Sequence, residues 1–182
     1  MAYPKITVNT GKAFEILASD TIPIPSPYSV PLTGTTTNTR ADGLDDSSAD
    51  FSNVVVGDIV YNTSTSTLTT VTGISSSTSL DLAANIFQAV GAGENYIVWQ
   101  AGPIFEKRIE SSSGCLLYVG SNVAKGNMTI GDQYGDVKVK TTQGDIVTFN
   151  NFPVGDYLPL QIVQLYSTGT DTAIRNQCLA IW

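Results

Sequence analysis

The feature that most constrains this chain is the regular spacing of its turn-forming clusters. Short runs rich in Val, Ile, Thr and Tyr, such as Leu68–Ile74 and Asn95–Trp99, alternate polar and apolar residues. Clusters of Ser, Thr, Gly and Asp, such as Thr63–Thr67 and Ser75–Thr78, separate these runs at intervals of about ten residues. Strands of this length and spacing are typical of small antiparallel barrels, meanders and sandwiches. The pattern therefore predicts an all-β protein.

The composition agrees with this fold class and limits the possible partners. Asp outnumbers Glu by 12 to 4, and Asp favours turns and caps, whereas Glu favours helix interiors. The chain has a net charge of −7, and its nine Lys and Arg residues are scattered. Because phosphate binding needs a basic surface, we expect no nucleic-acid partner. Since no apolar run suits a signal peptide or a membrane span, we expect no membrane partner and folding in the cytoplasm.

The predicted strands divide the chain into three parts. Residues 1–34 form an extended N-terminal arm with two possible short strands, residues 35–100 a small β-barrel or meander, and residues 101–182 a β-sandwich. The fold class is therefore all-β, with two small antiparallel β units and an extended arm. The strands expected after the arm are Asn53–Asn62 (interrupted at Gly57-Asp58), Leu68–Ile74, Ser79–Leu82, Asn95–Trp99, Cys115–Val119, Met128–Ile130, Asp136–Lys140, Asp145–Phe149, Leu158–Tyr166 and Cys178–Trp182. The bulky end Leu179–Trp182 is expected to be paired inside a sheet or an interface.

The arm contains a proline-rich segment that suits an intermolecular contact. Its prolines hold the backbone extended and offer no hydrogen-bond donor, so the segment cannot be a central strand. Its apolar side chains nonetheless favour burial against another surface of this chain or of a neighbour. The candidate contact residues are Ile22, Pro23, Ile24, Pro25, Tyr28 and Val30. A rigid linker explains the same prolines equally well.

Residues able to carry catalysis are scarce. The chain has no histidine, which excludes Ser-His-acid and Cys-His nucleophilic sites and histidine-based zinc sites. No glycine-rich phosphate-binding loop is present. Paired carboxylates suffice for glycoside cleavage, but most acidic residues here lie beside Gly or Ser in predicted turns. We therefore predict that the protein is not an enzyme, with no catalytic, cofactor-binding or metal-binding residues and no cofactor.

Three other features have a structural and a functional interpretation. Cys115 and Cys178 lie in apolar, strand-like runs, where free buried thiols are expected and a disulfide is the alternative. Sixteen aromatic residues lie mostly in alternating strands, where packing explains them better than a sugar-binding platform. The acidic loop, whose Asp residues are Asp42, Asp45, Asp46 and Asp50, has oxygen ligands that suit Ca²⁺. It lacks the order of a calcium-binding loop and a closing Glu, so a solvated loop is favoured.

The dipeptide Gly-Asp recurs five times, and two copies extend to the same four residues. Gly57-Asp58-Ile59-Val60 matches Gly144-Asp145-Ile146-Val147. In each, we expect the glycine to adopt a positive φ in a turn and the aspartate to fix the turn before a strand begins. Four residues of shared turn chemistry indicate convergence rather than a duplicated domain.

Two stretches of the chain carry sequence patterns that can be compared with a known family. The first runs from Leu44 to Trp99, and the second from Gly144 to Trp182. The residues of these patterns are Asp46–Phe51, Val54–Asn62, Leu80–Leu82, Ile86-Phe87 and Tyr96-Ile97 in the first stretch, and Gly144–Phe149, Pro153–Gly155, Leu158–Ile162, Thr168–Thr170 and Leu179–Trp182 in the second. With these residues both stretches resemble structural proteins of tailed-bacteriophage particles, and the second is similar to the endings of phage decoration proteins.

The resemblance implies a virion structural protein, and most directly a capsid decoration or cement protein. Such a protein binds the major capsid protein lattice on the capsid surface, often as a homotrimer, and stabilises the shell after assembly in the host cytoplasm. The residues Ile22 to Val30 are then expected to contact the capsid or a neighbouring subunit. The alternatives are a head fibre, neck or tail component, and a carbohydrate-binding receptor module.

Overall fold

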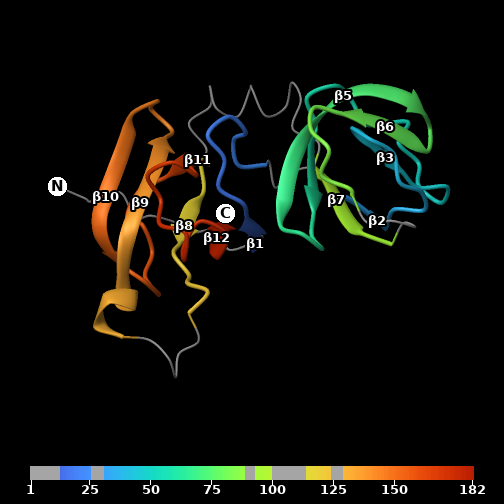
Figure 1. The fold of residues 1–182 in the computed structure, drawn as a ribbon. Coiled ribbons are helices and arrows are strands. Elements are labelled where there is room, and N and C mark those ends of the chain that lie inside the picture. The colour runs from blue at the N-terminus through green and yellow to red at the C-terminus, as the bar shows by residue number, and fades with distance from the viewer. Residues whose placement is uncertain (1–12, 26–30, 89–92, 100–113, 124–128) are drawn as a thin grey trace. The chain divides into compact units, whose positions relative to one another are not determined.

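The computed structural model describes residues 13–25, 31–88, 93–99, 114–123 and 129–182 (Figure 1). The regular elements within these residues are β-strands and one short 3₁₀ helix, and the strands pair antiparallel. The predicted all-β fold class is therefore confirmed. The chain forms two compact units: unit 1 comprises Met1–Asp20 and Ser113–Trp182, and unit 2 comprises Thr21–Ser112. The described residues include no helix long and apolar enough to cross a membrane.

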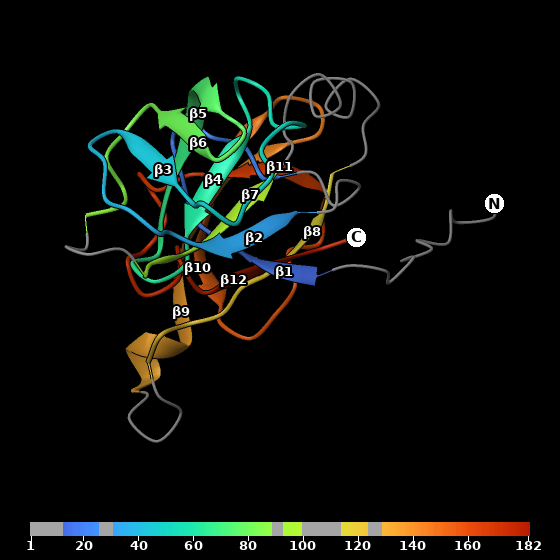
Figure 2. The same cartoon turned by 90° about the vertical axis from the view of Figure 1, so that its right-hand side faces the viewer.

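Unit 2 is a single curled sheet in the strand order β2-β7-β4-β5-β6-β3. Its strands are β2 (Leu32–Thr35), β3 (Gly43–Asp45), β4 (Ile59–Asn62), β5 (Thr67–Ser76), β6 (Ser79–Leu82) and β7 (Asn95–Trp99). The curl brings the two ends of the sheet together, since Asn38 after β2 forms a bridge with Asp45 of β3 (Figure 2). The N–H of Thr37 also donates to the carbonyl of Asp45 over 2.8 Å. The unit is thus a partly closed barrel.

The core of unit 2 fills the concave side of this sheet. Phe51 belongs to this core and is fully buried, and its ring approaches that of Tyr96 with centroids 6.1 Å apart. Phe87 meets the same tyrosine ring edge-on at 6.4 Å. The other core side chains are Leu44, Val54, Val60, Val71, Leu80, Leu82 and Val98. Leu80 and Leu82 alternate along β6 with half-buried neighbours, which is the pattern that the sequence showed.

Unit 1 contains two three-stranded sheets, in the orders β1-β12-β8 and β10-β9-β11. Their strands are β1 (Ala13–Ile16), β8 (Leu116–Tyr118), β9 (Tyr134–Thr141), β10 (Ile146–Pro153), β11 (Ile162–Leu165) and β12 (Cys178–Ile181). Isolated bridges, Cys115 to Ile162 and Tyr118 to Tyr157, join the β8 region to the second sheet and its neighbourhood. Fully buried apolar side chains, including Leu117 and Leu158, form its core.

The C-terminal strand β12 is the central strand of its sheet, between β1 and β8. The ring of Trp182 stacks on that of Phe14, with centroids 5.0 Å apart. The expectation that the bulky end is paired inside a sheet is therefore confirmed. Its partner β1 lies within the predicted arm and belongs to unit 1, while β2, at the arm's other end, belongs to unit 2.

Four predicted segments differ from the structure. Of the strand expected over Leu158–Tyr166, only Ile162–Leu165 forms one. The strand expected over Asn53–Asn62 begins at Ile59, because the N–H of Val55 donates to the Asp58 carboxylate and closes a turn before it. The predicted acidic loop contains the short strand β3, which pairs with β6. Instead of a strand ending at Ile130, a 3₁₀ helix spans Ile130–Gln133, while Met128 lies outside the described residues. The N–H of Thr129 donates to the Asp132 carboxylate at 2.8 Å and stabilises that turn.

The two Gly-Asp-Ile-Val copies have the expected backbone. Gly57 and Gly144 have φ of +97° and +93°, and each precedes a strand, β4 or β10. Of the other Gly-Asp copies, Gly155 also has a positive φ of 93°. The remaining two differ, because Gly131 lies in the 3₁₀ helix and Gly135 in β9.

Candidate functional site

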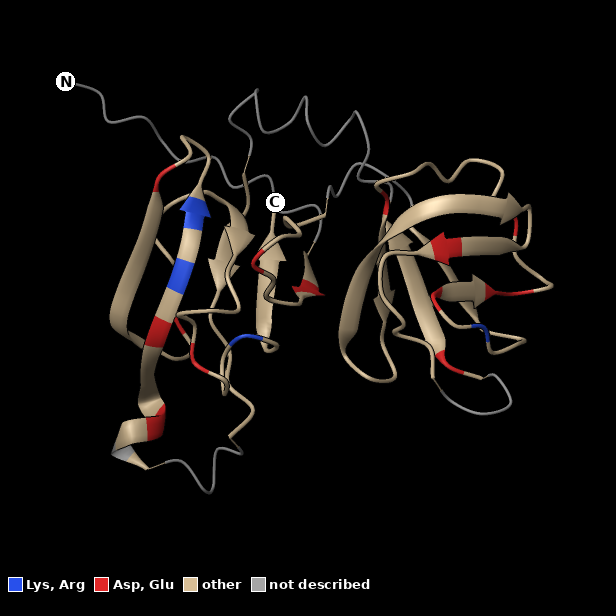
Figure 3. Ribbon diagram, turned by 45° about the horizontal axis from the view of Figure 1, so that its top comes forward, with Lys and Arg blue, Asp and Glu red and all other residues tan. Residues whose placement is uncertain are grey.

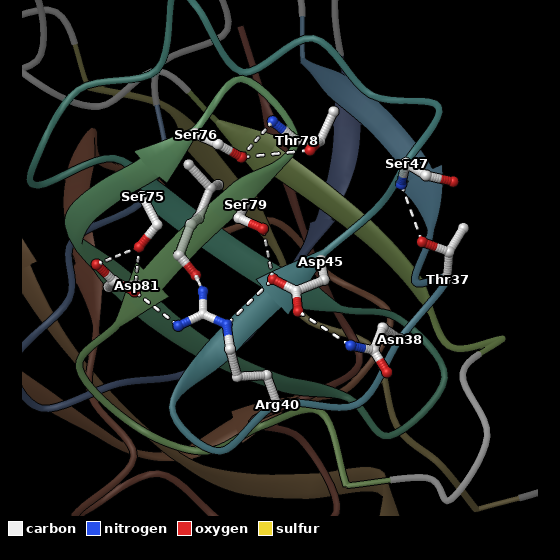
Figure 4. Close-up of polar contacts among 11 residues, drawn as sticks. Thr37, Asn38, Arg40, Asp45, Ser47, Ser75, Ser76, Thr78, Ser79 and Asp81 are labelled. Atoms are coloured by element: carbon white, nitrogen blue, oxygen red, sulfur yellow. Dashed lines mark hydrogen bonds and ion pairs between the residues drawn. The ribbon is translucent and has the colours of Figure 1, made fainter.

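The polar contacts drawn in Figure 4 centre on Arg40, in the loop before β3. Its Nε donates to Asp45 Oδ1 at 3.1 Å, and its Nη1 donates to Asp81 Oδ1 at 2.7 Å. Its Nη2 donates to the backbone carbonyl of Leu80 at 2.5 Å. The guanidinium therefore ties together β3 and β6. It lies directly against Gly43, where a Cβ atom would collide with it.

Hydroxyl groups donate further hydrogen bonds to the two carboxylates of this cluster, those of Asp45 and Asp81. Ser75 donates to both oxygens of Asp81, at 2.8 and 2.9 Å, and Ser79 donates to Asp45 Oδ1 at 2.8 Å. The hydrogen bond from Arg40, and then that from Ser75, hold the pKa of Asp81 below its usual value. Each carboxylate oxygen already accepts from this chain, Asp45 Oδ2 from the Asn38 amide at 3.5 Å. The cluster therefore stabilises the contact between strands β3 and β6 and is not an open binding site.

The acidic loop does not bring its four carboxylates together. Asp46 is buried and accepts from the Tyr96 hydroxyl at 2.8 Å and from the Ser48 N–H at 2.9 Å. Asp50 caps the N–H of Ser52 at 3.0 Å. Among the described residues, no group of three or more His, Cys, Asp or Glu side chains could hold a metal ion. The aspartates of the acidic loop thus take part in turns, in strand β3 and in a buried hydrogen bond.

Two buried polar contacts were not predicted from the sequence. Asn62 is fully buried, and its Nδ2 donates to Glu94 Oε1 at 2.9 Å and to the carbonyl of Ile86 at 2.8 Å. The Oδ1 of Asn62 also accepts from the N–H of Ser64 at 2.9 Å, which shapes the β4–β5 turn. Burial raises the pKa of Tyr96, and its hydrogen bond to Asp46 adds to this effect. The sequence offered one signal, since Asn62 ends a run of buried apolar residues.

The predicted contact segment is only partly available to a partner. Ile24 and Pro25 are buried within this chain, while Ile22 and Pro23 are half-buried. Tyr28 and Val30 lie outside the described residues. The role of this segment as an intermolecular contact stays a prediction, and among its described side chains Ile22 and Pro23 are the ones that a partner can reach.

The cysteines have the expected structural role. Cys115 and Cys178 are buried and form no disulfide, and their thiols lie 3.5 and 3.4 Å from the carbonyls of Ile162 and Ile174. Burial raises the pKa of Cys178 to about 12. A thiol with so high a pKa carries almost no thiolate at neutral pH and is a poor nucleophile.

Several exposed apolar side chains are not explained by the polar contacts, and the highest exposure in each unit lies at one of two places. In unit 2, Val55 and Val56 are 44% and 60% exposed in the turn before β4. In unit 1, Ile146 of β10 is 56% exposed, on a strand without charged residues. Both places are suited to contacts with other proteins, because apolar groups there remain in water in the isolated chain.

Comparison of the chain with protein-family models, with curated proteins and with solved structures finds no match.

Proposed function

We propose that this protein is a structural component of a tailed-phage particle, acting as a decoration protein that binds the lattice of major capsid protein. In this role, each copy contributes a modest contact and the repeated lattice supplies multivalency. The function is carried by surface burial, with no bond-making step. The protein would lie on the capsid surface and stabilise the shell.

The observation that carries this proposal is where the phage-like residues lie in the fold. In the first stretch, Leu44 to Trp99, the matching residues lie in β4, β6 and β7 and in the Val54–Asn62 segment that leads into β4. The second stretch, Gly144 to Trp182, supplies β10, β11 and β12 of unit 1. The resemblance therefore falls on the strands of both units and is not confined to one turn.

The exposed pair Val55 and Val56 supports a contact made by unit 2. These residues lie inside the first phage-like stretch, between buried Val54 and the turn glycine Gly57. The chain as a whole presents a surface with few charges, since charged residues make up 14% of it. Such a surface can be covered by a partner with little cost in removing ions from water.

The decisive experiment counts copies of the protein in purified particles by quantitative mass spectrometry. A decoration protein is expected at a copy number close to that of the capsid lattice sites, and should bind expanded shells but not immature ones. A count of a few to tens of copies would assign the protein to the head fibre, neck or tail instead. Absence from the particles, or saturable glycan binding lost on substitution of an exposed Tyr, would overturn the proposal.

A matched pair of variants tests the contact itself. Val56→Asp places a charge in the exposed apolar pair and should weaken binding to expanded shells at least tenfold. Thr72→Asp is the control, because Thr72 is exposed on β5 of the same unit. Both proteins should keep the wild-type melting temperature. Equal binding by the two variants would exclude this pair as the capsid contact.

A further inference from the structure

Strand β10 is an open edge of unit 1. It pairs with β9 on one side, and no described strand or loop pairs with its other side. Its eight residues, Ile146–Pro153, include no charged side chain. Natural edge strands are usually shortened or carry Lys or other charges, because an exposed edge pairs readily with another strand. Apart from Pro153 and an irregularity after Phe149, β10 lacks these protections.

The backbone groups of Thr148 point away from β9. Thr148 lies opposite Lys138, whose carbonyl accepts from the N–H of Tyr166 on the β11 side at 2.9 Å. The Lys138 N–H is also used on that side, since it donates to the Thr170 hydroxyl at 2.9 Å. Pairs in an antiparallel ladder alternate between bonded and non-bonded, so the N–H and C=O of Thr148 face the open edge.

The inner face of β10 is incompletely covered. Val147 and Phe149 lie opposite Val139 and Val137 of β9 and therefore share their face of the sheet. The two β9 valines are fully buried, but Val147 and Phe149 remain half-exposed. The apolar face of this sheet thus continues to the edge strand β10, where no neighbouring strand covers Val147 and Phe149.

Charge favours a second copy of this chain as that neighbour. Two copies with a net charge of −7 repel each other in general. At this edge, however, β10 is uncharged, and the next strand presents Lys138 and Lys140 beside Asp136 (Figure 3). Two β10 strands can therefore meet with no carboxylate in either strand, and Asp145, directly before Ile146, is the nearest acidic residue along the chain.

We propose that β10 pairs antiparallel with β10 of a second copy across a two-fold axis. Centred on Thr148, this pairing places Val147 beside Phe149 of the second copy and joins two three-stranded layers into one of six strands. A pair of identical surfaces related by a two-fold axis closes on itself, so the association stops at the dimer. The strand is about 27 Å long at 3.4 Å per residue, so the interface is small and the dimer should dissociate on dilution.

This inference does not rest on the proposed function, because the edge belongs to the isolated chain. It differs from the threefold association that the resemblance implies, and the oligomeric state separates the two. A trimer unaffected by changes in β10 would overturn the inference and leave a decoration role intact. Lattice binding by a β10-linked dimer would support both.

Cysteine cross-linking tests the register directly. In a two-fold pairing centred on Thr148, the two Thr148 Cα atoms lie about 5.5 Å apart, within the range that a disulfide spans. Oxidised Thr148→Cys protein should give a covalent dimer at least tenfold faster than Thr72→Cys, the control on an interior strand. The native thiols are buried in both variants and do not compete. Equal rates for the two variants would overturn the pairing.

Sedimentation velocity tests the association without cross-linking. The wild-type mass should rise with concentration from 19.3 kDa towards twice that value. Thr148→Pro removes an outward N–H but no bond to β9, and should shift the dissociation constant at least tenfold upward. Thr148→Lys is a second variant, which keeps the backbone donor but places a charge on the edge strand, and it should also weaken the dimer. Thr148→Val is the control expected to dimerise normally. A wild-type protein that stays monomeric throughout the series would refute the proposal.

Discussion

The two units of this protein use opposite means to stabilise a small β fold. Unit 2 buries polar and charged side chains, including Asp46, Asn62 and Glu94, inside one curled sheet. Unit 1 has an interior of aliphatic residues and two thiols, with Gln164 and Thr170 as its buried polar residues within the described ranges. Unit 2 joins its sheet ends through Asn38 and Asp45, whereas unit 1 leaves β10 open.

This difference links closure of a sheet to the chemistry of its interior. A curled sheet must bring its end strands together at defined positions. Hydrogen bonds are directional, so they can fix these positions. Two separate three-stranded sheets need only bury apolar area, which is a non-directional interaction and can stop at an unfinished edge. Unit 2 is therefore expected to be sensitive to loss of single polar groups, and unit 1 to loss of apolar volume.

The largest expected effects come from emptying each core in turn. Phe51→Ala should lower the unfolding free energy by about 3–5 kcal/mol and Leu158→Ala by about 2–5 kcal/mol, because each leaves a cavity in a fully buried site. Hydrogen exchange followed by mass spectrometry should show lost protection in unit 2 for the first variant and in unit 1 for the second. Equal loss in both units for either variant would show that the chain unfolds as one body.

The second-largest loss of stability is expected from removing the buried Tyr96 hydroxyl of unit 2. Tyr96→Phe removes the donor at 2.8 Å from Asp46 while keeping the ring, and leaves a buried carboxylate oxygen unsatisfied. The expected loss of stability is about 1–3 kcal/mol, measured by urea unfolding. Tyr134→Phe, at a half-exposed tyrosine of unit 1, is the control and should change stability little. Equal effects from the two substitutions would contradict the polar character assigned to unit 2.

The shared Gly-Asp-Ile-Val turns offer the same test in both units. Gly57→Ala and Gly144→Ala should each cost about 1–2 kcal/mol, because φ near +95° strains an L-residue. Neither added Cβ meets another atom within 4 Å, so the cost is in the backbone alone. Gly131→Ala, at a glycine without positive φ, serves as the control in thermal melting. Different costs at the two turns would argue against their shared chemistry.

The smallest effect concerns Arg40 and is visible in its pH dependence. Arg40→Gln should cost about 1 kcal/mol at neutral pH, since the ion pairs are partly exposed and screened by solvent. The pKa of Asp81 is lowered in the folded state, so its stabilisation is present at neutral pH and is lost as pH falls below 3.8, the ordinary aspartate value. Urea unfolding across this range should show a shallower acid-side decline in the variant, while Arg175→Gln behaves as wild type.

Strands with a clear alternating pattern were predictable from the sequence. Ser79–Leu82 and Asn95–Trp99 have the predicted bounds, because alternation and flanking turn residues both mark them. The strand β3 was missed, since its three residues lie in an acidic run with no pattern of their own. Its place depends on Arg40, three residues before it, and on the β6 backbone, which lies more than 30 residues further along the chain.

The candidate sites were predictable to a similar degree. The buried thiols and the two glycine turns follow from local sequence, because burial in an apolar run and a positive φ have local signals. The contact of Arg40 with Asp81 joins residues 41 positions apart, and that of Tyr96 with Asp46 joins residues 50 apart. Such pairings depend on how the sheet curls, which no local pattern encodes.

The central position of β12 sets an order of events during synthesis of the chain. Strand β1 is translated before all of unit 2, and its partner β12 is translated after it. Unit 2 is contiguous and can therefore fold as it leaves the ribosome, while Ala13–Ile16 must wait for residues made much later. During this interval the β1 strand is unpaired and open to chaperones, so slowed translation beyond Ser112 should prolong its exposure to proteases.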